Sequence, residues 1–313
     1  MVPVTTNEQW AQLIKHIDPH GKWVRAWELK GGVSAQVTAL EMVGADGQKR
    51  KIVVRRHGEA DLAQNPHAAR DEFHLLQVLH ALGLPVPTPL HIEESSGIFP
   101  TPCIAIEYIE GRTELSPADL TDYLNQFTAA LAQIHRVDYV RQDITFLPDQ
   151  SAIYRQTLRR QPSCLDESKV ERCIWDTLTS IWPLPQHNEP VLLHGDFWPG
   201  NILWHEQRLV AIIDWEDAAV GDPLADVANS RLELLWAFGH DAMNHFTHQY
   251  RAMMPAVDFT NLPYWDLCAA LRPAHSMAHW GLDARTEKSM RSKLNEFVKL
   301  AFDQLDETIG GSK

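Results

Sequence analysis

Three oxygen-bearing side chains stand beside short apolar runs in the second half of the sequence. In the stretch VLLHGDFWPGNILW, residues 191–204, Asp196 and Asn201 are five positions apart. Asp214 follows the apolar run Val210–Ile213, thirteen residues after Asn201. Carboxylate and amide oxygens are the hard ligands that Mg²⁺ prefers, and Mg²⁺ usually keeps substrate phosphates in its remaining positions. The residue types therefore favour a magnesium and phosphate site.

The apolar runs that flank these polar residues are predicted to be strands. Val191–Leu193 and Ile202–Trp204 are of the kind that pair inside a sheet, and Gly195, Pro199 and Gly200 mark the turn between them. The polar residues then lie at the mouth of a loop. We expect two strands to deliver the three oxygen-bearing side chains to one edge of a small sheet.

The first third of the chain has strand-like and helix-like patterns in alternation. Ser34–Val43 and Lys51–Arg56 are predicted strands, joined by the turn Gly44-Ala45-Asp46-Gly47 into a hairpin. The segment His67–Leu82 has the apolar face of a helix, and the strand-like Ile104–Ile109 follows it.

Helices dominate after residue 111. Ser116 is a candidate N-cap for a helix with Pro117 in its first turn and apolar residues at helical spacing from Leu120 to Ile134. One further strand is predicted at Leu209–Ile213. Further helices are predicted over residues 167–182, 224–238, 262–282 and 286–307. The patterns together predict an α+β chain with a small strand-rich lobe and a larger helical lobe.

Size and composition exclude several classes of protein. A chain of 313 residues is long enough for two lobes around one cleft. Its 28 Lys and Arg against 41 Asp and Glu argue against a nucleic-acid-binding surface and favour cationic ligands. The sequence shows no signal-peptide pattern and no apolar run near the ~18–20 residues that a membrane span needs.

Cysteine and histidine usage adds two expectations. The four cysteines include no Cys-x-x-Cys pair, which favours reduced thiols and a cytoplasmic protein. The 16 histidines include no HExxH pattern, and we interpret them as structural.

The segments around Asp196 and Asp214 also match a known family. HGDFWPGN at 194–201 and IDWEDAAVGDPLADVA at 213–228 resemble the aminoglycoside phosphotransferase family, relatives of choline kinase with the protein-kinase-like fold. The resemblance implies a small N-terminal antiparallel-sheet lobe for nucleotide binding over residues 1–106. It further implies a larger, mainly helical catalytic and substrate-binding lobe over 107–313, with a hinge at about 104–111.

The resemblance implies roles for the residues of the second lobe. Asp196 would orient or deprotonate the attacking hydroxyl, while Asn201 and Asp214 would hold Mg²⁺ against the phosphates of ATP or GTP. His194 would shape the loop by hydrogen bonding, and Asp226 would buttress it. Turn chemistry alone is the alternative for Asp196 and Asn201, and simple helix capping is the alternative for Asp226.

In the first lobe the resemblance implies contacts with the nucleotide. Gly32 and Ser34 lie where kinase-like folds place a phosphate-covering loop, although a plain turn has the same composition. Arg55 would contact the α- and β-phosphates, with Arg56 as the competing choice because a one-residue register error exchanges the faces of a strand. Glu72, on the apolar face of its helix, would pair with Arg55, and a surface charge is the alternative.

The hinge and the acceptor site are less closely specified. Backbone groups of Glu107 and Ile109 would offer adenine a donor and an acceptor. Trp198, Glu216 and Asp217 are candidates to contact the acceptor. Because the protein has a net negative charge, the acceptor could be a cation. Other acidic residues that could line an acceptor pocket are Glu233, Asp266 and Asp283.

The hypothesis is an ATP- and Mg²⁺-dependent phosphotransferase that moves the γ-phosphate of a nucleoside triphosphate onto a hydroxyl of a small molecule. Aminoglycosides, amino alcohols and sugars are the candidate acceptors, and neither nucleic acid nor membrane is an expected partner. A protein substrate is not expected because Ala-Pro-Glu is missing after Asp214. The alternatives are a non-catalytic nucleotide-binding regulatory protein of the same fold, and a metal-dependent hydrolase using His194 and Asp196. The sequence leaves the oligomeric state open.

Overall fold

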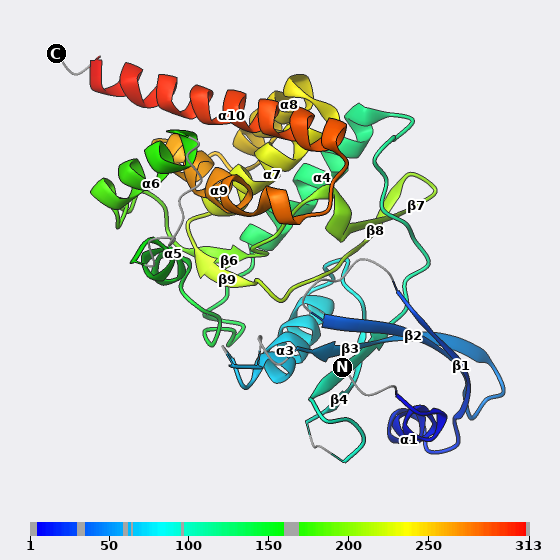
Figure 1. Ribbon diagram of the computed structural model, residues 1–313. Coiled ribbons are helices and arrows are strands. Elements are labelled where there is room, and N and C mark those ends of the chain that lie inside the picture. Colours follow the sequence, from blue (N-terminus) through cyan, green and yellow to red (C-terminus); the bar gives the residue numbers. More distant parts are fainter. Residues whose placement is uncertain are drawn as a thin grey trace. The chain divides into compact units, whose positions relative to one another are not determined.

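The protein forms two compact units. The computed structural model describes residues 5–29, 35–58, 62–63, 65–94, 97–159 and 169–310. The first unit comprises Met1–Arg112 and Val210–Glu216, and the second comprises Thr113–Leu209 and Asp217–Lys313. An antiparallel sheet dominates the first unit and helices dominate the second, which confirms the predicted α+β class (Figure 1). Gly32 and Ser34 lie outside the described residues.

A five-stranded antiparallel sheet in the order β1-β2-β3-β5-β4 is the framework of the first unit (Figure 1). Its strands are β1 (Lys22–Glu28), β2 (Ala35–Val43), β3 (Lys49–His57), β4 (Pro89–Glu93) and β5 (Cys103–Glu107). The predicted hairpin is confirmed, because β2 and β3 pair from Ala35 opposite His57 to Val43 opposite Lys49. Gly47 has a φ of 77°, a conformation that glycine adopts without strain, in the turn between them.

Two helices pack on opposite faces of this sheet. On one face α1 (Asn7–Ile17) buries Trp10, Leu13 and Ile14 against a core that includes Ile52 and Val54 of β3. The helix α3 (Ala68–Ala81), predicted from its apolar periodicity, buries Glu72 and the leucines at 75, 76 and 79. Because side chains alternate along a strand, the residues of β3 that face α3 are those at odd positions.

The second unit is mainly helical, as the periodicity of its apolar residues predicted. Its helices are α4 (Leu120–His135), α5 (Gln150–Arg159), α6 (Lys169–Ile181), α7 (Leu224–Phe238), α8 (His240–Met253), α9 (Leu262–Ser276) and α10 (Ala284–Gly310). Short 3₁₀ turns occur at η1 (Pro199–Asn201) and η2 (Met277–His279). No helix within the described ranges is both long enough and apolar enough to cross a membrane.

The predicted cap of α4 is wrong by three residues. The helix begins after Asp119, whose side chain accepts a hydrogen bond from the backbone N–H of Asp122 at 3.0 Å. Ser116 lies before the helix, and its N–H donates to the side chain of Glu114 at 2.9 Å. Asp is as good an N-cap as Ser, so the residue types alone could not decide between the two positions.

The two strands that flank the polar loop do not pair with each other, contrary to the expectation of one small sheet. Strand β6 (Val191–Leu193) pairs with β9 (Ala219–Gly221), whereas β7 (Ile202–His205) pairs with β8 (Arg208–Ile212). The two residues between β7 and β8, Glu206 and Gln207, have φ values of 47° and 64°. Positive φ at both central residues is the geometry of the turn that best closes a hairpin, so β7 takes its nearest neighbour as partner.

Candidate active site

The loop between β6 and β7 brings Asp196 and Asn201 together. The Nδ2 of Asn201 donates to the backbone oxygen of Asp196 at 2.9 Å and to its Oδ2 at 3.2 Å. Asn201 ends the 3₁₀ turn η1, and its backbone N–H donates to the oxygen of Trp198 at 3.0 Å. Within the described residues, the side-chain oxygen of Asn201 accepts no hydrogen bond. The loop therefore presents one carboxylate and one amide oxygen side by side.

Asp226, near the start of α7, holds the backbone of this loop. Its carboxylate accepts hydrogen bonds from the N–H groups of His194 at 2.7 Å and Gly195 at 2.9 Å. It also contacts Nε2 of His135 at 3.2 Å, and Nδ1 of His135 lies 2.6 Å from the hydroxyl of Tyr250. Burial acts to raise the pKa of Asp226, but the contacts with His135 and His194 outweigh it and lower that pKa. A charged, fully bonded carboxylate thus fixes the loop from behind.

The geometry of the loop requires glycine at two positions. Gly195 has a φ of 84°, and a Cβ there would lie 2.0 Å from the backbone oxygen of Asp217. At Gly200 a Cβ would lie 2.2 Å from the indole of Trp198. The ring of Trp198, a candidate for contact with the acceptor, therefore packs on its own loop. His194 is buried, and its Nδ1 accepts a hydrogen bond from the backbone N–H of Asp196 at 3.3 Å.

The charges around Asp196 are mixed. The Nη1 of Arg272 lies 3.8 Å from Oδ1 of Asp196 and 4.0 Å from Oδ2 of Asp217, and the Arg272 side chain is 72% exposed. Burial, together with the charge of Asp196, raises the pKa of Glu233 to about 8, so Glu233 is mostly protonated at neutral pH. Asp196 thus has an exposed cation beside it and influences a carboxyl group that is mostly neutral.

Two other acidic residues that were considered as acceptor linings, Asp266 and Asp283, make structural contacts. Asp266 is buried and binds Arg231 through both of its oxygens, at 3.0 Å each. Asp283 accepts hydrogen bonds from the backbone N–H groups of Arg285 and Thr286 and so caps the start of α10. Asp266 is thus enclosed by its ion pair, whereas Asp283 caps a helix and stays exposed.

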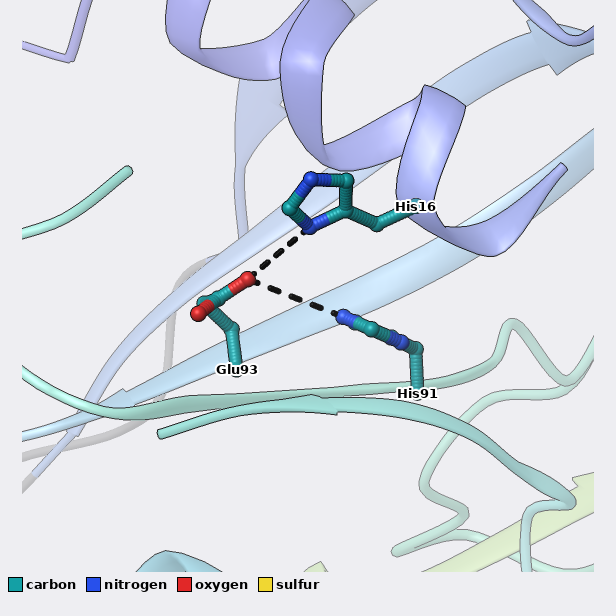
Figure 2. Close-up of side chains that lie close together, drawn as sticks. All are labelled: His16, His91 and Glu93. Atoms are coloured by element: carbon teal, nitrogen blue, oxygen red, sulfur yellow. Dashed lines mark hydrogen bonds and ion pairs between the residues drawn. The ribbon is translucent and has the colours of Figure 1, made fainter. Parts of the chain in front are cut away.

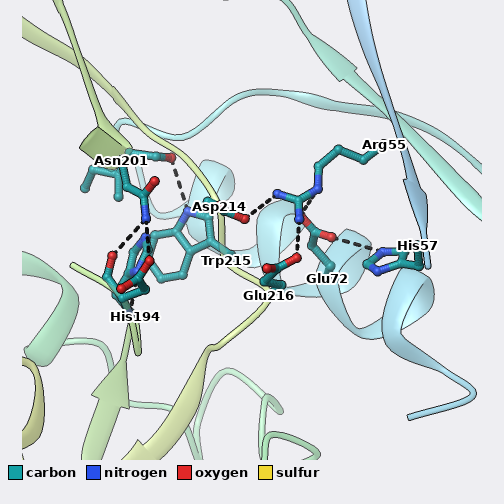
Figure 3. Close-up of polar contacts among 10 residues, drawn as sticks. Arg55, His57, Glu72, His194, Asn201, Asp214, Trp215 and Glu216 are labelled. Carbon is teal, nitrogen blue, oxygen red and sulfur yellow. Dashed lines mark hydrogen bonds and ion pairs between the residues drawn. The ribbon is translucent and has the colours of Figure 1, made fainter. Parts of the chain in front are cut away.

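In the first unit, Arg55 of β3 is buried among three carboxylates (Figure 3). Its Nη1 donates to Oδ1 of Asp214 at 2.7 Å, and its Nη2 donates to Oε2 of Glu216 at 2.7 Å. Its Nε lies 3.5 Å from Oε1 of Glu72, so the ion pair expected between β3 and α3 is present. The other oxygen of Glu72 lies 3.1 Å from Nε2 of His57, which is on the same face of β3 as Arg55.

The neighbouring arginine faces the other side of the sheet. The guanidinium carbon of Arg56 lies 5.2 Å from the ring centroid of Phe99 and 5.9 Å from that of Trp10 on α1. A strand turns successive side chains to opposite faces, so only one of the two arginines can meet Glu72. In the structure, Arg55 makes that contact.

The charges around Arg55 do not cancel. Among these four described side chains, one guanidinium faces the carboxylates of Glu72, Asp214 and Glu216, which is an excess of negative charge within the group. Burial acts to lower the pKa of Arg55, but the three carboxylates outweigh it and raise that pKa. Burial likewise acts to raise the pKa of Glu72, but Arg55 and His57 lower it below its ordinary value.

Asp214 has the properties of a ligand for a hard divalent cation. Its side chain is 33% exposed, and its Oδ2 accepts no hydrogen bond from the described part of the chain, while its Oδ1 is held by Arg55. Asp214 follows β8, which ends at Ile212, and its φ of 69° turns the backbone sharply there. The available oxygen and the excess negative charge both fit Mg²⁺.

The hinge segment offers fewer free backbone groups than expected. The N–H of Glu107 donates to the oxygen of Thr88 at 2.8 Å, and its side chain accepts from the hydroxyl of Thr88 at 2.5 Å. The N–H of Ile109 makes no hydrogen bond to any described residue. Of these two N–H groups, that of Ile109 is therefore the one available to a ligand.

The contacts of two residues, Arg272 and Glu216, were not predicted from the sequence. Arg272 lies on α9, far along the chain from Asp196, and no motif links the two. Glu216 was a candidate for acceptor contact, yet its carboxylate binds Arg55. Its position two residues after Asp214 is the one feature that could have indicated a shared partner.

Comparison with known proteins places this chain in a family. The pattern of the phosphotransferase enzyme family matches residues 28–259. Mouse acyl-CoA dehydrogenase family member 10 is 32% identical over 199 residues, which cover 58% of this chain. The chain spans only 18% of the length of that relative.

Solved structures with the same fold include a candidate aminoglycoside phosphotransferase from Ralstonia eutropha. It has a TM-score of 0.70 at 14% identity, with 97% of this chain and 99% of that one covered. The GDP complex of an aminoglycoside 2'-phosphotransferase has a TM-score of 0.62 at 17% identity and covers 98% of this chain and 100% of its own. With the family pattern matching more than two thirds of its residues, the chain belongs to the phosphotransferase enzyme family.

Proposed function

We propose that this protein transfers the γ-phosphate of ATP or GTP onto a hydroxyl group of a small molecule, with Mg²⁺ as cofactor. The observation that carries the proposal is the cluster around Arg55, where three carboxylates meet one buried guanidinium and Asp214 keeps one oxygen available. Membership of the phosphotransferase enzyme family supports the reaction class. We also propose that residues 1–106 bind the nucleotide and that residues 107–313 carry catalysis and the acceptor site.

In the proposed reaction Asp196 acts on the acceptor. The hydroxyl oxygen of the acceptor forms a bond to the γ-phosphorus, and the bond between that phosphorus and the bridging oxygen breaks to release the nucleoside diphosphate. The proton of the hydroxyl passes to the carboxylate of Asp196. Asn201 and Asp226 hold the loop in place, which supports the positioning that phosphoryl transfer needs.

Asn201 and Asp214 are the proposed ligands of Mg²⁺, and each has one side-chain oxygen that accepts no hydrogen bond in the described structure. Bound Mg²⁺ would neutralise charge on the phosphates during transfer. Arg55 is the proposed phosphate contact, and the carboxylate of Glu72 holds its guanidinium in place. Two of its nitrogens donate to Asp214 and Glu216, so a phosphate would share the guanidinium with them.

The nucleotide is proposed to lie along the strand-rich unit. A phosphotransferase with the same fold was solved as a GDP complex, which supports a nucleotide as the donor. Ile109 is the proposed backbone donor to the base, and the carbonyl oxygen of Glu107 is the proposed acceptor. Gly32 and Ser34 stay proposals for phosphate contact from the sequence alone.

The acceptor is proposed to be a polar small molecule that approaches Asp196 past Asp217 and Trp198. Asp217 is exposed and shares Arg272 with Asp196, so it can bind a hydroxyl or an amino group. Glu233, mostly protonated at neutral pH, can donate or accept a hydrogen bond without adding charge. Aminoglycosides are the first acceptors to test, because solved proteins with this fold act on them.

The proposal is tested by separating nucleotide binding from transfer. Purified protein is titrated with Mg·ATP by calorimetry, and ADP release is then measured against aminoglycosides, amino alcohols and sugars. Asp196→Asn should bind Mg·ATP like the wild type and lose transfer by about 10²–10⁴-fold, which is the range for a catalytic base. Asp241→Asn, an exposed carboxylate on α8, is the matched control and should change neither.

Three outcomes separate the alternatives. Binding of Mg·ATP without transfer to any acceptor would favour a regulatory nucleotide-binding protein. Phosphate release from a substrate without a nucleotide would favour a hydrolase. Full transfer activity in Asp196→Asn would contradict the role assigned to Asp196.

A further inference from the structure

Three side chains with metal-binding atoms meet in the first unit, away from Arg55. His16 lies in the last turn of α1, and His91 and Glu93 lie on β4 (Figure 2). The Nδ1 of His16 is 3.0 Å from Oε2 of Glu93, and the Nε2 of His91 is 3.8 Å from the same oxygen. The three donor atoms all lie within 4.8 Å of one another.

The fold brings these residues together from two elements that are far apart in the sequence. His91 and Glu93 are two positions apart on β4, so they point to the same face of the sheet. They pair with Ala105 and Cys103 of β5, which belong to the core that α1 covers. His16 thus reaches an edge strand from the helix that packs on the same face.

The cluster leaves a polar atom unsatisfied. Glu93 is only 7% exposed, and the Nε2 of His91 is buried and makes no hydrogen bond within the described structure. A neutral imidazole can present a nitrogen lone pair to a metal ion.

We propose that His16, His91 and Glu93 bind a Zn²⁺ ion that ties α1 to the edge strand β4. Two imidazole nitrogens and one carboxylate oxygen are a common Zn²⁺ donor set, with water in the fourth position. Zn²⁺ binds N and O ligands at about 2.0–2.2 Å, so two ligands of a tetrahedral ion lie about 3.4 Å apart. The separations of 3.0 and 3.8 Å from Glu93 are close to this distance.

The composition of the site also selects the metal. Mg²⁺ prefers an octahedron of oxygen ligands, which this cluster does not offer, whereas imidazole suits Zn²⁺. The His16 side chain is 44% exposed, so an ion can enter and a water can complete its coordination. The ion would not take part in phosphoryl transfer, and its effect would be to stabilise the folded protein.

The test is a titration of the full-length, chelator-treated protein with Zn²⁺, followed by calorimetry and by thermal unfolding. The wild type should bind one equivalent tightly, and its Tm should rise with Zn²⁺ but not with Mg²⁺. His16→Ala removes an exposed ligand and should weaken that site by at least about 100-fold, because even loss of an outer-shell partner costs 10–100-fold. His80→Ala, an exposed histidine in the last turn of α3, is the matched control and should bind like the wild type.

The variants His91→Ala and Glu93→Gln test the same site independently of His16→Ala. Circular dichroism would reveal whether any one of the variants is poorly folded. All three ligand variants should lose the same single site and the Zn²⁺-dependent rise in Tm. Absence of tight binding to the wild type would overturn the proposal. Equal binding by the wild type, His16→Ala and His80→Ala would overturn it as well, because the zinc would then be held elsewhere.

Discussion

Arg55 in the first unit and Arg231 in the second are both buried arginines that contact carboxylates, and they differ in the charge around them. Arg231 binds both oxygens of Asp266 at 3.0 Å and donates to the hydroxyl of Thr247 at 2.6 Å, so one cation meets one anion. Arg55 meets three anions. The first arrangement is complete as it stands, whereas the second leaves negative charge for a cation to neutralise.

This difference separates structural carboxylates from candidate ligand sites. Both oxygens of Asp266 are bound by one guanidinium, and both oxygens of Asp226 accept hydrogen bonds from the loop. Asp214 uses one oxygen for Arg55, and its side chain is a third exposed. We infer that an exposed oxygen in a cluster with excess negative charge indicates function better than burial or ion pairing alone.

The largest effect on stability is expected at the balanced pair. Asp266→Ala leaves the Arg231 guanidinium buried without its anion, which should lower the free energy of unfolding by about 3–5 kcal/mol. Chemical denaturation measures this loss. The double variant Arg231→Met, Asp266→Leu should recover most of it, because an apolar pair of similar size removes the buried charge.

In the folded fraction, Asp266→Ala should bind Mg·ATP like the wild type. If the variant lost nucleotide affinity but kept its stability, the Arg231–Asp266 pair would have a binding role and not the structural role that we assign to it.

A smaller effect is expected at Asp226, whose two oxygens hold the loop. In Asp226→Asn one acceptor becomes a donor that faces a backbone N–H, and leaving such a group unsatisfied costs about 1–3 kcal/mol. If that cost appears as misplacement of Asp196, kcat should fall about 5- to 150-fold. The measurement is steady-state kinetics on an acceptor found by screening.

Asp226 is a positioning residue, so the affinity for Mg·ATP should stay unchanged in this variant. A fall in stability with kcat preserved would show that Asp226 only supports the fold.

A pH-dependent effect on stability is expected at Glu233. The pKa of Glu233 is raised from 4.5 to about 8 in the folded protein, so its protonated form favours folding below pH 4.5 and that contribution is lost as the pH rises through 8. Glu233→Gln cannot ionise. Relative to the wild type, the variant should therefore gain stability progressively as the pH rises from 4.5 to 8, by about 3–5 kcal/mol in all.

Denaturation at a series of pH values measures that difference. A constant difference across the range would show that Glu233 does not titrate there.

Local patterns in the sequence predicted the elements that depend on neighbours in the chain. The helix α3 follows from its apolar spacing, and the β2–β3 hairpin follows from the turn residues between its strands. Asp196, Asn201 and Asp214 were predicted as site residues because their spacing belongs to one local motif. The choice between Arg55 and Arg56 needed the structure, because adjacent residues in a strand face opposite ways.

Contacts between distant segments could not be predicted from a single sequence. The pairing of β6 with β9 joins segments separated by the whole β7–β8 hairpin. Arg272 reaches Asp196 from α9, and His16 reaches Glu93 from α1. The histidines were interpreted as structural because the sequence has no HExxH pattern, whereas His16, His91 and Glu93 come together only in the folded chain. The helix α8 was not among the predicted helices. The sequence could have indicated it, since its buried residues Ala242, Met243, Phe246 and Tyr250 follow helical spacing.

The most direct test of the central claim is calorimetric binding of ATP with and without Mg²⁺, for the wild type and for Asp214→Ala. Asp214 is the member of the Arg55 cluster with an available oxygen, so its loss should abolish the gain in affinity that Mg²⁺ gives, an effect of at least about tenfold or 1.4 kcal/mol. The wild type should bind ATP more tightly with Mg²⁺ than without it. If Asp214→Ala bound Mg·ATP as tightly as the wild type and turned over at the same rate, the cluster around Arg55 would be a structural ion pair and the account would be wrong.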